Sequence, residues 1–136
     1  MALGGKVERS KEGYNVGIET TVFGQKRPWM KPSYDALPLY MFHEDQVTEL
    51  PVGCELIGSS ENCRVASFAK GDHIFTTQAH PEFTHEFMSC VLKCTESSMS
   101  AADAENAWAS LTQEQLGQVF STWCTHFFKQ AKRHAG

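Results

Sequence analysis

The stretch FAKGDHIFTTQAHPEF, residues 68–83, decides the fold that we predict for this chain. Apolar and β-branched residues lie on both sides of Gly71 and Asp72, two residue types that are common in turns, so this part predicts a β-hairpin. After Pro81 the apolar residues recur with a spacing of about 3.6 instead of two, which predicts a helix. The His-Pro-Glu segment around Pro81 therefore lies where a strand ends and a helix begins.

The residues before this stretch favour extended structure and one long loop. In the later part of residues 4–23, apolar and β-branched residues alternate with a period of two, which is typical of a strand. Residues 25–38 contain three of the five prolines, and we expect a surface loop there because proline cannot pair continuously in a sheet. Short apolar runs predict further strands at residues 39–42, 54–57 and 64–68.

Helices are expected in the last third of the chain. The core-facing residues expected on the first helix are Phe83, Phe87, Cys90 and Cys94. We expect its two thiols to pack in the core rather than to form a redox pair. An alanine-rich helix is expected at residues 101–109, and a longer one after Ser110, whose Ser-Leu-Thr-Gln segment fits a capping box. The apolar stripe expected on this last helix is Leu116, Phe120, Trp123 and Phe127. Strands followed by helices indicate an α/β layer architecture.

The composition fits a single domain over residues 1–136. Hydrophobic residues make up 41% and charged residues 21% of the chain, which is ordinary for a globular protein. The net charge is -4 and most basic residues are scattered, so binding of nucleic acid through a basic face is disfavoured. Apolar runs are far shorter than the roughly 18 residues of a membrane span. The first residues lack the apolar stretch of a secretory signal, so we expect a cytoplasmic protein without membrane association.

The cysteines and histidines indicate neither a disulfide framework nor a metal site. The five cysteines are odd in number and contain no Cys-x2-Cys pair, so free thiols are expected. His80 and His85 are five residues apart and would point about 140 degrees apart on a helix. We therefore expect no bound metal ion and no cofactor.

His80 and Glu82 are the most specific candidates for chemistry. A carboxylate two residues from an imidazole can hold the ring in one tautomer and stabilise its charged form. Pro81 favours an extended conformation at His80, so the two side chains start on the same side of the backbone. A base and its orienting partner should lie about 2.6 to 3.2 Å apart, with the other imidazole nitrogen facing an open cleft. The alternative is a structural hydrogen-bonded pair at a strand end.

Three blocks of the sequence resemble class I glutamine amidotransferases, in particular members of GMP synthase type and γ-glutamyl peptidases. The blocks are residues 68–83, residues 42–53 with the sequence FHEDQVTELPVG, and residues 2–9 with the sequence ALGGKVER. The resemblance implies the C-terminal part of a flavodoxin-like α/β fold, with a mixed sheet that contains the hairpin and is followed by C-terminal helices. It also implies that His80 is the catalytic base and Glu82 its orienting carboxylate.

The second block places Phe42 and His43 beside the substrate, according to the resemblance. A half-buried histidine at a strand end is the alternative for His43. Members of this family hydrolyse glutamine or a γ-glutamyl amide through a Cys-His-Glu triad. Their nucleophilic cysteine lies in a Gly-x-Cys-x-Gly-like turn, and none of the five cysteines of this sequence lies in one.

Two functions are therefore open from the sequence. In the first, the chain is a partial amidotransferase-like domain that lacks the nucleophile half, would bind glutamine or a γ-glutamyl compound, and is inactive alone. In the second, it is a pseudoenzyme that serves as a non-catalytic interaction or scaffold subunit. In both, the surface that the missing half would cover is expected to self-associate or to bind a protein partner.

Overall fold

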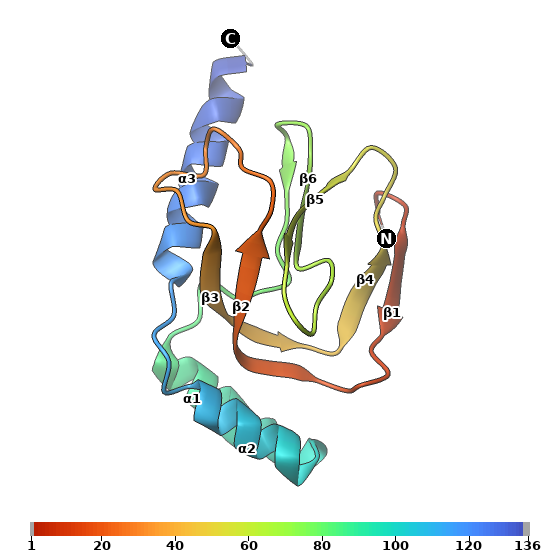
Figure 1. Cartoon of the computed structure of the whole chain (residues 1–136), viewed down its shortest axis with the longest axis vertical. Coiled ribbons are helices and arrows are strands. Elements are labelled where there is room, and N and C mark those ends of the chain that lie inside the picture. The colour runs from red at the N-terminus through yellow and green to blue at the C-terminus, as the bar shows by residue number, and fades with distance from the viewer. Residues whose placement is uncertain (1, 135–136) are drawn as a thin grey trace.

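The structure is a computed structural model that describes residues 2–134. Its elements in chain order are β1 (Lys6–Arg9), β2 (Asn15–Phe23), β3 (Ala36–His43), β4 (Asp45–Glu49), β5 (Glu55–Ser59), β6 (Ser67–Lys70), β7 (Ile74–Phe75), α1 (His85–Thr95), the 3-10 helix η1 (Glu96–Ser98), α2 (Ala101–Ser110) and α3 (Gly117–His134). A five-stranded sheet has the order β3-β2-β5-β6-β7, and β1 pairs with β4 in a two-stranded sheet. Figure 1 shows α3 alongside β3, with α1 and α2 together at one end of the sheet.

The predicted α/β class, the hairpin and the C-terminal helices are all present. β6 and β7 form the hairpin around Gly71, which has a positive φ of 55° that glycine adopts without strain. The pairing continues past β7, because the N–H of Thr76 donates to the Phe68 carbonyl at 2.9 Å and that of Gln78 to the Ala66 carbonyl at 2.8 Å. All pairings between the described strands are antiparallel, so the mixed sheet that the resemblance implies is not present in this part of the chain.

Strand β3 is hydrogen-bonded on both of its edges. On one edge it pairs with β2 along its whole length. On the other edge Met41 forms an antiparallel bridge with Ala79, and the backbone N–H of His80 donates to the Tyr40 carbonyl at 2.8 Å. The sheet therefore curls until the segment after β7 reaches β3, so the chain itself covers part of this edge of β3.

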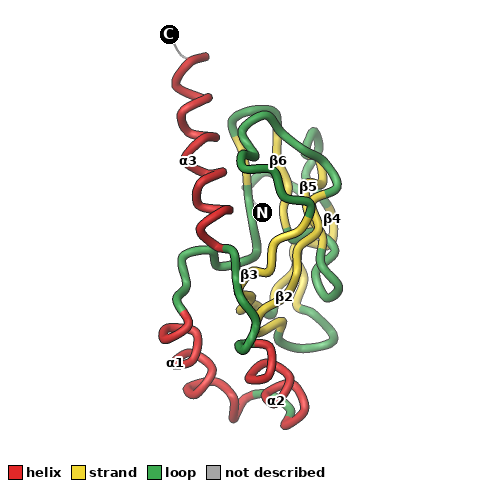
Figure 2. The backbone as a smooth tube through the Cα atoms, turned by 60° about the vertical axis from the view of Figure 1, so that its left-hand side comes forward, coloured by secondary structure: helices red, strands yellow, loops and turns green. Residues whose placement is uncertain are grey.

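Helix α3 lies along one face of the curled sheet (Figure 2). Its residues Phe120, Trp123 and Phe127 are buried in one cluster with side chains of β2, β3, β5 and β6. Three residues of the stripe expected on the last helix are therefore confirmed, while Leu116 lies just before the helix and packs partly buried against the same cluster. No helix of the described chain is both long enough and apolar enough to cross a membrane.

The proline-rich segment between β2 and β3 contributes to the core, so its prediction as a surface loop is wrong in part. Trp29 and Met30 are only 4% and 1% exposed. The loop is held against α3 because the indole N–H of Trp123 donates to the Pro32 carbonyl at 2.8 Å. The ring of Trp29 also packs edge-on against that of Phe127, with the centroids 5.3 Å apart.

The buried face of α1 differs from the one that the apolar spacing predicts. Met88 and Leu92 are buried, and they pack in a second cluster with Tyr40 and with side chains of β2 and α2. Cys90 and Cys94 are exposed, and Phe87, which the sequence also predicts to face the core, is 51% exposed. The prediction that these thiols point into the core is wrong, because the sheet and α2 pack against the opposite face of the helix, which carries Met88 and Leu92.

The capping box predicted at Ser110 is also wrong, since α2 ends at this residue and α3 begins at Gly117. The hydroxyl of Ser110 accepts a hydrogen bond from the backbone N–H of Ile18 at 2.8 Å and donates to the Ala107 carbonyl at 2.7 Å. Helix α2 can approach β2 this closely because Gly17, with a φ of 107°, has no side chain that would collide with the hydroxyl. The hydroxyl of Ser110 therefore makes a tertiary contact instead of capping a helix.

Two adjacent phenylalanines on α3 provide a matched test of this packing. Phe127 is 5% exposed and Phe128 is 66% exposed. We expect Phe127→Ala to lower the free energy of unfolding by about 3 to 5 kcal/mol, because it leaves a cavity in the core. The control Phe128→Ala should change it by less than about 0.5 kcal/mol. Urea unfolding followed by circular dichroism measures both, and equal losses would contradict the observed face of α3.

Candidate active site

His80 is fixed by regular structure on both sides. The preceding segment pairs with β6, and the backbone N–H of His80 itself is bonded to β3. Four residues later Thr84 caps α1, because its hydroxyl accepts a hydrogen bond from the N–H of Phe87 at 3.2 Å. His80 therefore lies between the end of the extended segment and the start of the helix, as the sequence predicts.

Glu82 contacts the imidazole of His80 directly. Its Oε1 atom lies 2.9 Å from Nδ1, within the range expected for an orienting partner. The side chains of His80 and Glu82 are 31% and 64% exposed, so water weakens their mutual attraction. We conclude that this contact orients the ring rather than stabilising the fold.

The second imidazole nitrogen does not face an open cleft. Nε2 of His80 lies 3.3 Å from the backbone carbonyl of Phe42, near the end of β3. The carbonyl and the Glu82 carboxylate are both acceptors, and a neutral ring can donate to only one of them. The carboxylate is charged and closer, so a neutral ring carries its proton on Nδ1. The long contact at Nε2 leaves this nitrogen available for exchange with another partner.

Aromatic rings hold the face of the imidazole. The ring of Phe83 stacks on His80 with a centroid separation of 4.2 Å and an interplanar angle of 11°. Phe87 packs edge-on against Phe83 at 4.6 Å. His80 thus has a neighbour at each nitrogen and a stacked ring on one face, which restricts the orientation of its imidazole.

His43 lies at the end of β3 and is arranged as a neutral imidazole. Its Nδ1 donates to the Asp45 carbonyl at 3.0 Å, and its Nε2 lies 3.5 Å from the amide nitrogen of Asn15. Burial lowers the pKa of His43, and a positive charge on His80 acts in the same direction. The structure thus places His43 close enough to His80 for the two charges to interact.

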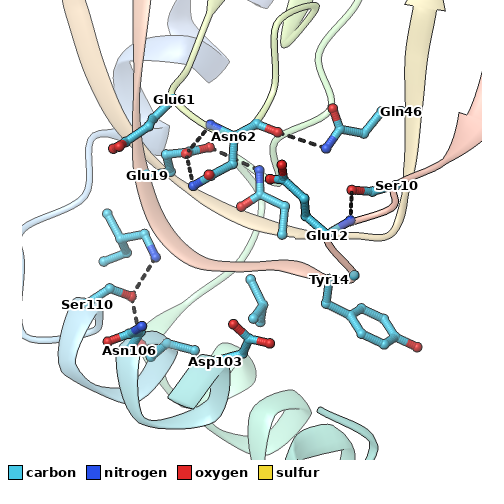
Figure 3. A pocket seen from close by; sticks show the side chains of 15 residues that line it. Ser10, Glu12, Tyr14, Glu19, Gln46, Glu61, Asn62, Asp103, Asn106 and Ser110 are labelled. Carbon is cyan, nitrogen blue, oxygen red and sulfur yellow. Dashed lines mark hydrogen bonds between the residues drawn. The ribbon is translucent and has the colours of Figure 1, made fainter. Parts of the chain in front are cut away.

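A polar cavity of about 410 Å³ is lined by Asn15 but not by His80. Figure 3 shows the polar side chains that surround it. Its lining includes four carboxylates, Glu12, Glu19, Glu61 and Asp103, and no lysine, arginine or histidine. Glu19 is engaged by its neighbours, since its carboxylate accepts hydrogen bonds from Asn15, Ser60 and Asn62. Its contact with Asn15 links this cavity to His43, but the imidazole of His80 is not part of its wall.

Burial makes two thiols of the chain, one buried and one half-buried, poor nucleophiles. Burial raises the pKa of Cys63 to about 11, and its thiol donates to the side chain of Gln78 at 3.6 Å. Burial also raises the pKa of Cys124. Among residues 2–134 there is no group of three or more side chains that could hold a metal ion.

Sequence reasoning missed two of the groups around His80. The Phe42 carbonyl reaches Nε2 through the pairing of distant strands, for which the local sequence has no signal. The contact with Phe83 could have been predicted, because a turn at His80 brings the residue three positions later back beside the histidine. That turn is present, as the N–H of Phe83 donates to the His80 carbonyl at 3.2 Å.

We expect Glu82→Ala to change which nitrogen of the neutral His80 ring carries the proton. Without the carboxylate, the Phe42 carbonyl is the remaining acceptor, so protonation should move from Nδ1 towards Nε2. The nitrogen chemical shifts of the ring, measured by NMR, distinguish the two tautomers. Glu86→Ala is the matched control, because that carboxyl interacts with Thr84. Unchanged shifts in Glu82→Ala would show that the contact does not order the ring in solution.

We also expect His43→Gln to flatten the dependence of stability on pH. The folded pKa of His43 lies below its ordinary value of 6.5, so the unfolded chain binds the proton more readily. The contribution of His43 to the free energy of unfolding is therefore fully present above about pH 6.5, and it is lost as the pH falls below that value. Urea unfolding at about pH 7.5 and 5.5 should show a smaller loss in His43→Gln than in the unmodified chain. Phe127→Ala controls for lower stability as such, and equal losses in all three proteins would refute the assignment.

The family model for class I glutamine amidotransferases matches residues 1–92. Among curated proteins, Gamma-glutamyl peptidase 3 of Arabidopsis thaliana is 32% identical over 91 residues, covering 62% of this chain and 36% of that protein. The glutamine-hydrolyzing GMP synthase of Mannheimia succiniciproducens is 37% identical over 92 residues, covering 62% of this chain and 18% of that protein. The chain thus spans about a third or less of these relatives.

Solved structures show the same fold. A glutamine amidotransferase from Thermotoga maritima superposes with a TM-score of 0.72 at 18% identity, covering 92% of this chain and 55% of that one. A glutamine amidotransferase from Methylobacillus flagellatus gives 0.68 at 19% identity, covering 94% of this chain and 55% of that one. The fold expected from the sequence is confirmed, and the chain belongs to the class I glutamine amidotransferase family.

Proposed function

We propose that this chain carries the proton-transfer part of an amidotransferase site that hydrolyses glutamine or a γ-glutamyl amide. The observation that carries the proposal is the contact of 2.9 Å between Nδ1 of His80 and the carboxylate of Glu82, in the block that resembles the catalytic segment of the family. Membership of the family supports the substrate class, since the matched relatives are named γ-glutamyl peptidases and glutamine-hydrolyzing synthases.

In the proposed reaction a cysteine thiolate attacks the γ-carbonyl of the substrate. His80 passes a proton through Nε2 to the departing amine or ammonia, and later removes a proton from the water that hydrolyses the γ-glutamyl thioester. Glu82 keeps the ring oriented and stabilises the imidazolium ion. Phe42 and His43 border the substrate at the end of β3. The Phe42 carbonyl is a long contact, so Nε2 can exchange it for the reacting groups.

The thiolate has to be supplied by residues outside this sequence. None of the five cysteines lies in a glycine-flanked elbow. Cys63 is buried with its pKa raised to about 11, which leaves almost none of it ionised near neutral pH. We therefore propose that the chain is inactive alone and gains activity when a nucleophile-bearing segment completes the site.

A fusion protein tests this proposal. The part of Arabidopsis Gamma-glutamyl peptidase 3 that precedes its region of similarity is joined to residue 2 of this chain, and release of ammonia or glutamate is measured from glutamine and a γ-glutamyl anilide. We expect no release by the chain alone and measurable release by the fusion. In the fusion, His80→Ala should lower kcat/KM by about 10²- to 10⁴-fold, because general acid–base catalysis is lost.

The matched pair Glu82→Gln and Glu86→Gln separates orientation from general charge effects in the fusion. Both changes remove one negative charge near the start of α1, but only Glu82 contacts His80. We expect Glu82→Gln to lower kcat and Glu86→Gln to leave it near the starting value. A folded fusion whose activity survives His80→Ala would contradict the assignment of the base.

The alternative function is a non-catalytic interaction or scaffold subunit, which we propose as the second candidate. The Phe42 carbonyl favours it, because this oxygen lies 3.3 Å from Nε2 of His80 and occupies the position that a reacting group would need. In this case the chain should self-associate or bind a protein partner. Sedimentation velocity at micromolar concentration tests self-association, and an active fusion together with a monomeric chain would exclude this candidate.

A further inference from the structure

Helix α1 has an inner face and an outer face with different chemistry. Met88 and Leu92 are buried on the inner face. Cys90 and Cys94 lie exposed on the outer face, one helical turn apart. The helix is capped at its start by Thr84, so the spacing between the two thiols is that of a regular α-helix over residues 85–95.

The geometry of the helix determines the distance between the two sulfur atoms and therefore which bonds they can form. Residues four apart on a helix have Cβ atoms about 5 to 6 Å apart. A disulfide needs Cβ atoms about 3.5 to 4.5 Å apart. The intact helix therefore keeps the two sulfur atoms from bonding to each other, while both can reach one atom placed between them.

The other thiols of the chain differ in their accessibility. Cys63 is buried, and Cys54 and Cys124 are half-buried. The exposed cysteines are the two that share one face of α1. Lys93 precedes Cys94 in the last turn of the same helix and is also exposed.

We propose that Cys90 and Cys94 form a two-sulfur binding site for a soft monovalent metal ion of the copper(I) type. Thiolates prefer soft ions. The two thiols release two protons and form two bonds to the ion, so no electron is transferred and the site gains a single negative charge. A zinc site uses three or four protein ligands, and the described chain has no group of three or more suitable side chains. The geometry therefore favours an ion that is stable with two sulfur ligands.

Anaerobic competition for copper(I) tests the proposal on the chain as it exists. Copper(I) is supplied as its bathocuproine disulfonate complex, whose absorbance falls as the protein removes the ion. We expect one ion per chain. Cys90→Ser and Cys94→Ser should each lower the affinity by at least about tenfold, because one of two metal–sulfur bonds is lost. The matched control Cys54→Ser should bind as the unmodified chain does.

The contrary results are equally specific. Retained affinity in Cys90→Ser and Cys94→Ser, no removal of copper(I), or an equal loss in Cys54→Ser would overturn the site. Circular dichroism verifies that each variant is folded, which both exposed positions should tolerate. The geometry has its own test, since treatment with diamide should not produce an internal disulfide between Cys90 and Cys94 in the native chain. Rapid formation of that disulfide would show that the helix does not hold the sulfur atoms apart.

Discussion

Strand β3 is the element on which the rest of the structure depends, because it is hydrogen-bonded on both edges. One edge pairs with β2 throughout. The other receives the N–H of His80 at the Tyr40 carbonyl and that of Leu116 at the Pro38 carbonyl, both at 2.8 Å. The strand thereby joins the sheet, the segment that carries His80 and the connection to α3. A change that moved β3 would move all three.

This arrangement explains how an exposed pair of side chains can have a defined geometry. The contact between His80 and Glu82 is weak as a source of stability, since water reaches both groups. The ring is defined instead by its attachment to β3 at the backbone, by the Phe42 carbonyl and by the stacked ring of Phe83. Rigid supporting structure of this kind is what proton transfer at a fixed atom requires.

The parts of the structure that the sequence predicts well are those that local chemistry decides. The turn at Gly71, the strand before His80 and the spacing of His80 and Glu82 depend on residues within a few positions of each other. The last helix also has a single strong apolar stripe, so only one face of it can be buried. In these places the local sequence is compatible with one conformation only, and the structure has that conformation.

The wrong predictions occur where two solutions are locally equivalent and a distant contact chooses between them. Helix α1 has two apolar stripes, and packing against the sheet and α2 selects the one with Met88 and Leu92 instead of the one with the thiols. The sequence around Ser110 fits a helix cap, but its hydroxyl accepts a hydrogen bond from the backbone N–H of Ile18 instead. Trp29 lies among prolines typical of a surface loop, yet its ring is needed to fill the space beside α3.

The contacts of β3 also separate what this chain needs for folding from what it needs for catalysis. The solved amidotransferases that this chain resembles are about 1.7 times its length, since 92% and 94% of this chain cover 55% of each. Its curled sheet nevertheless closes on itself through the Met41 and Ala79 bridge, and its two core clusters are filled by its own side chains. The orientation of His80 needs nothing from outside the described residues, whereas the proposed thiolate does. Substitutions at the His80 and Glu82 pair should therefore affect reactivity without loss of folding, and those on β3 should affect both.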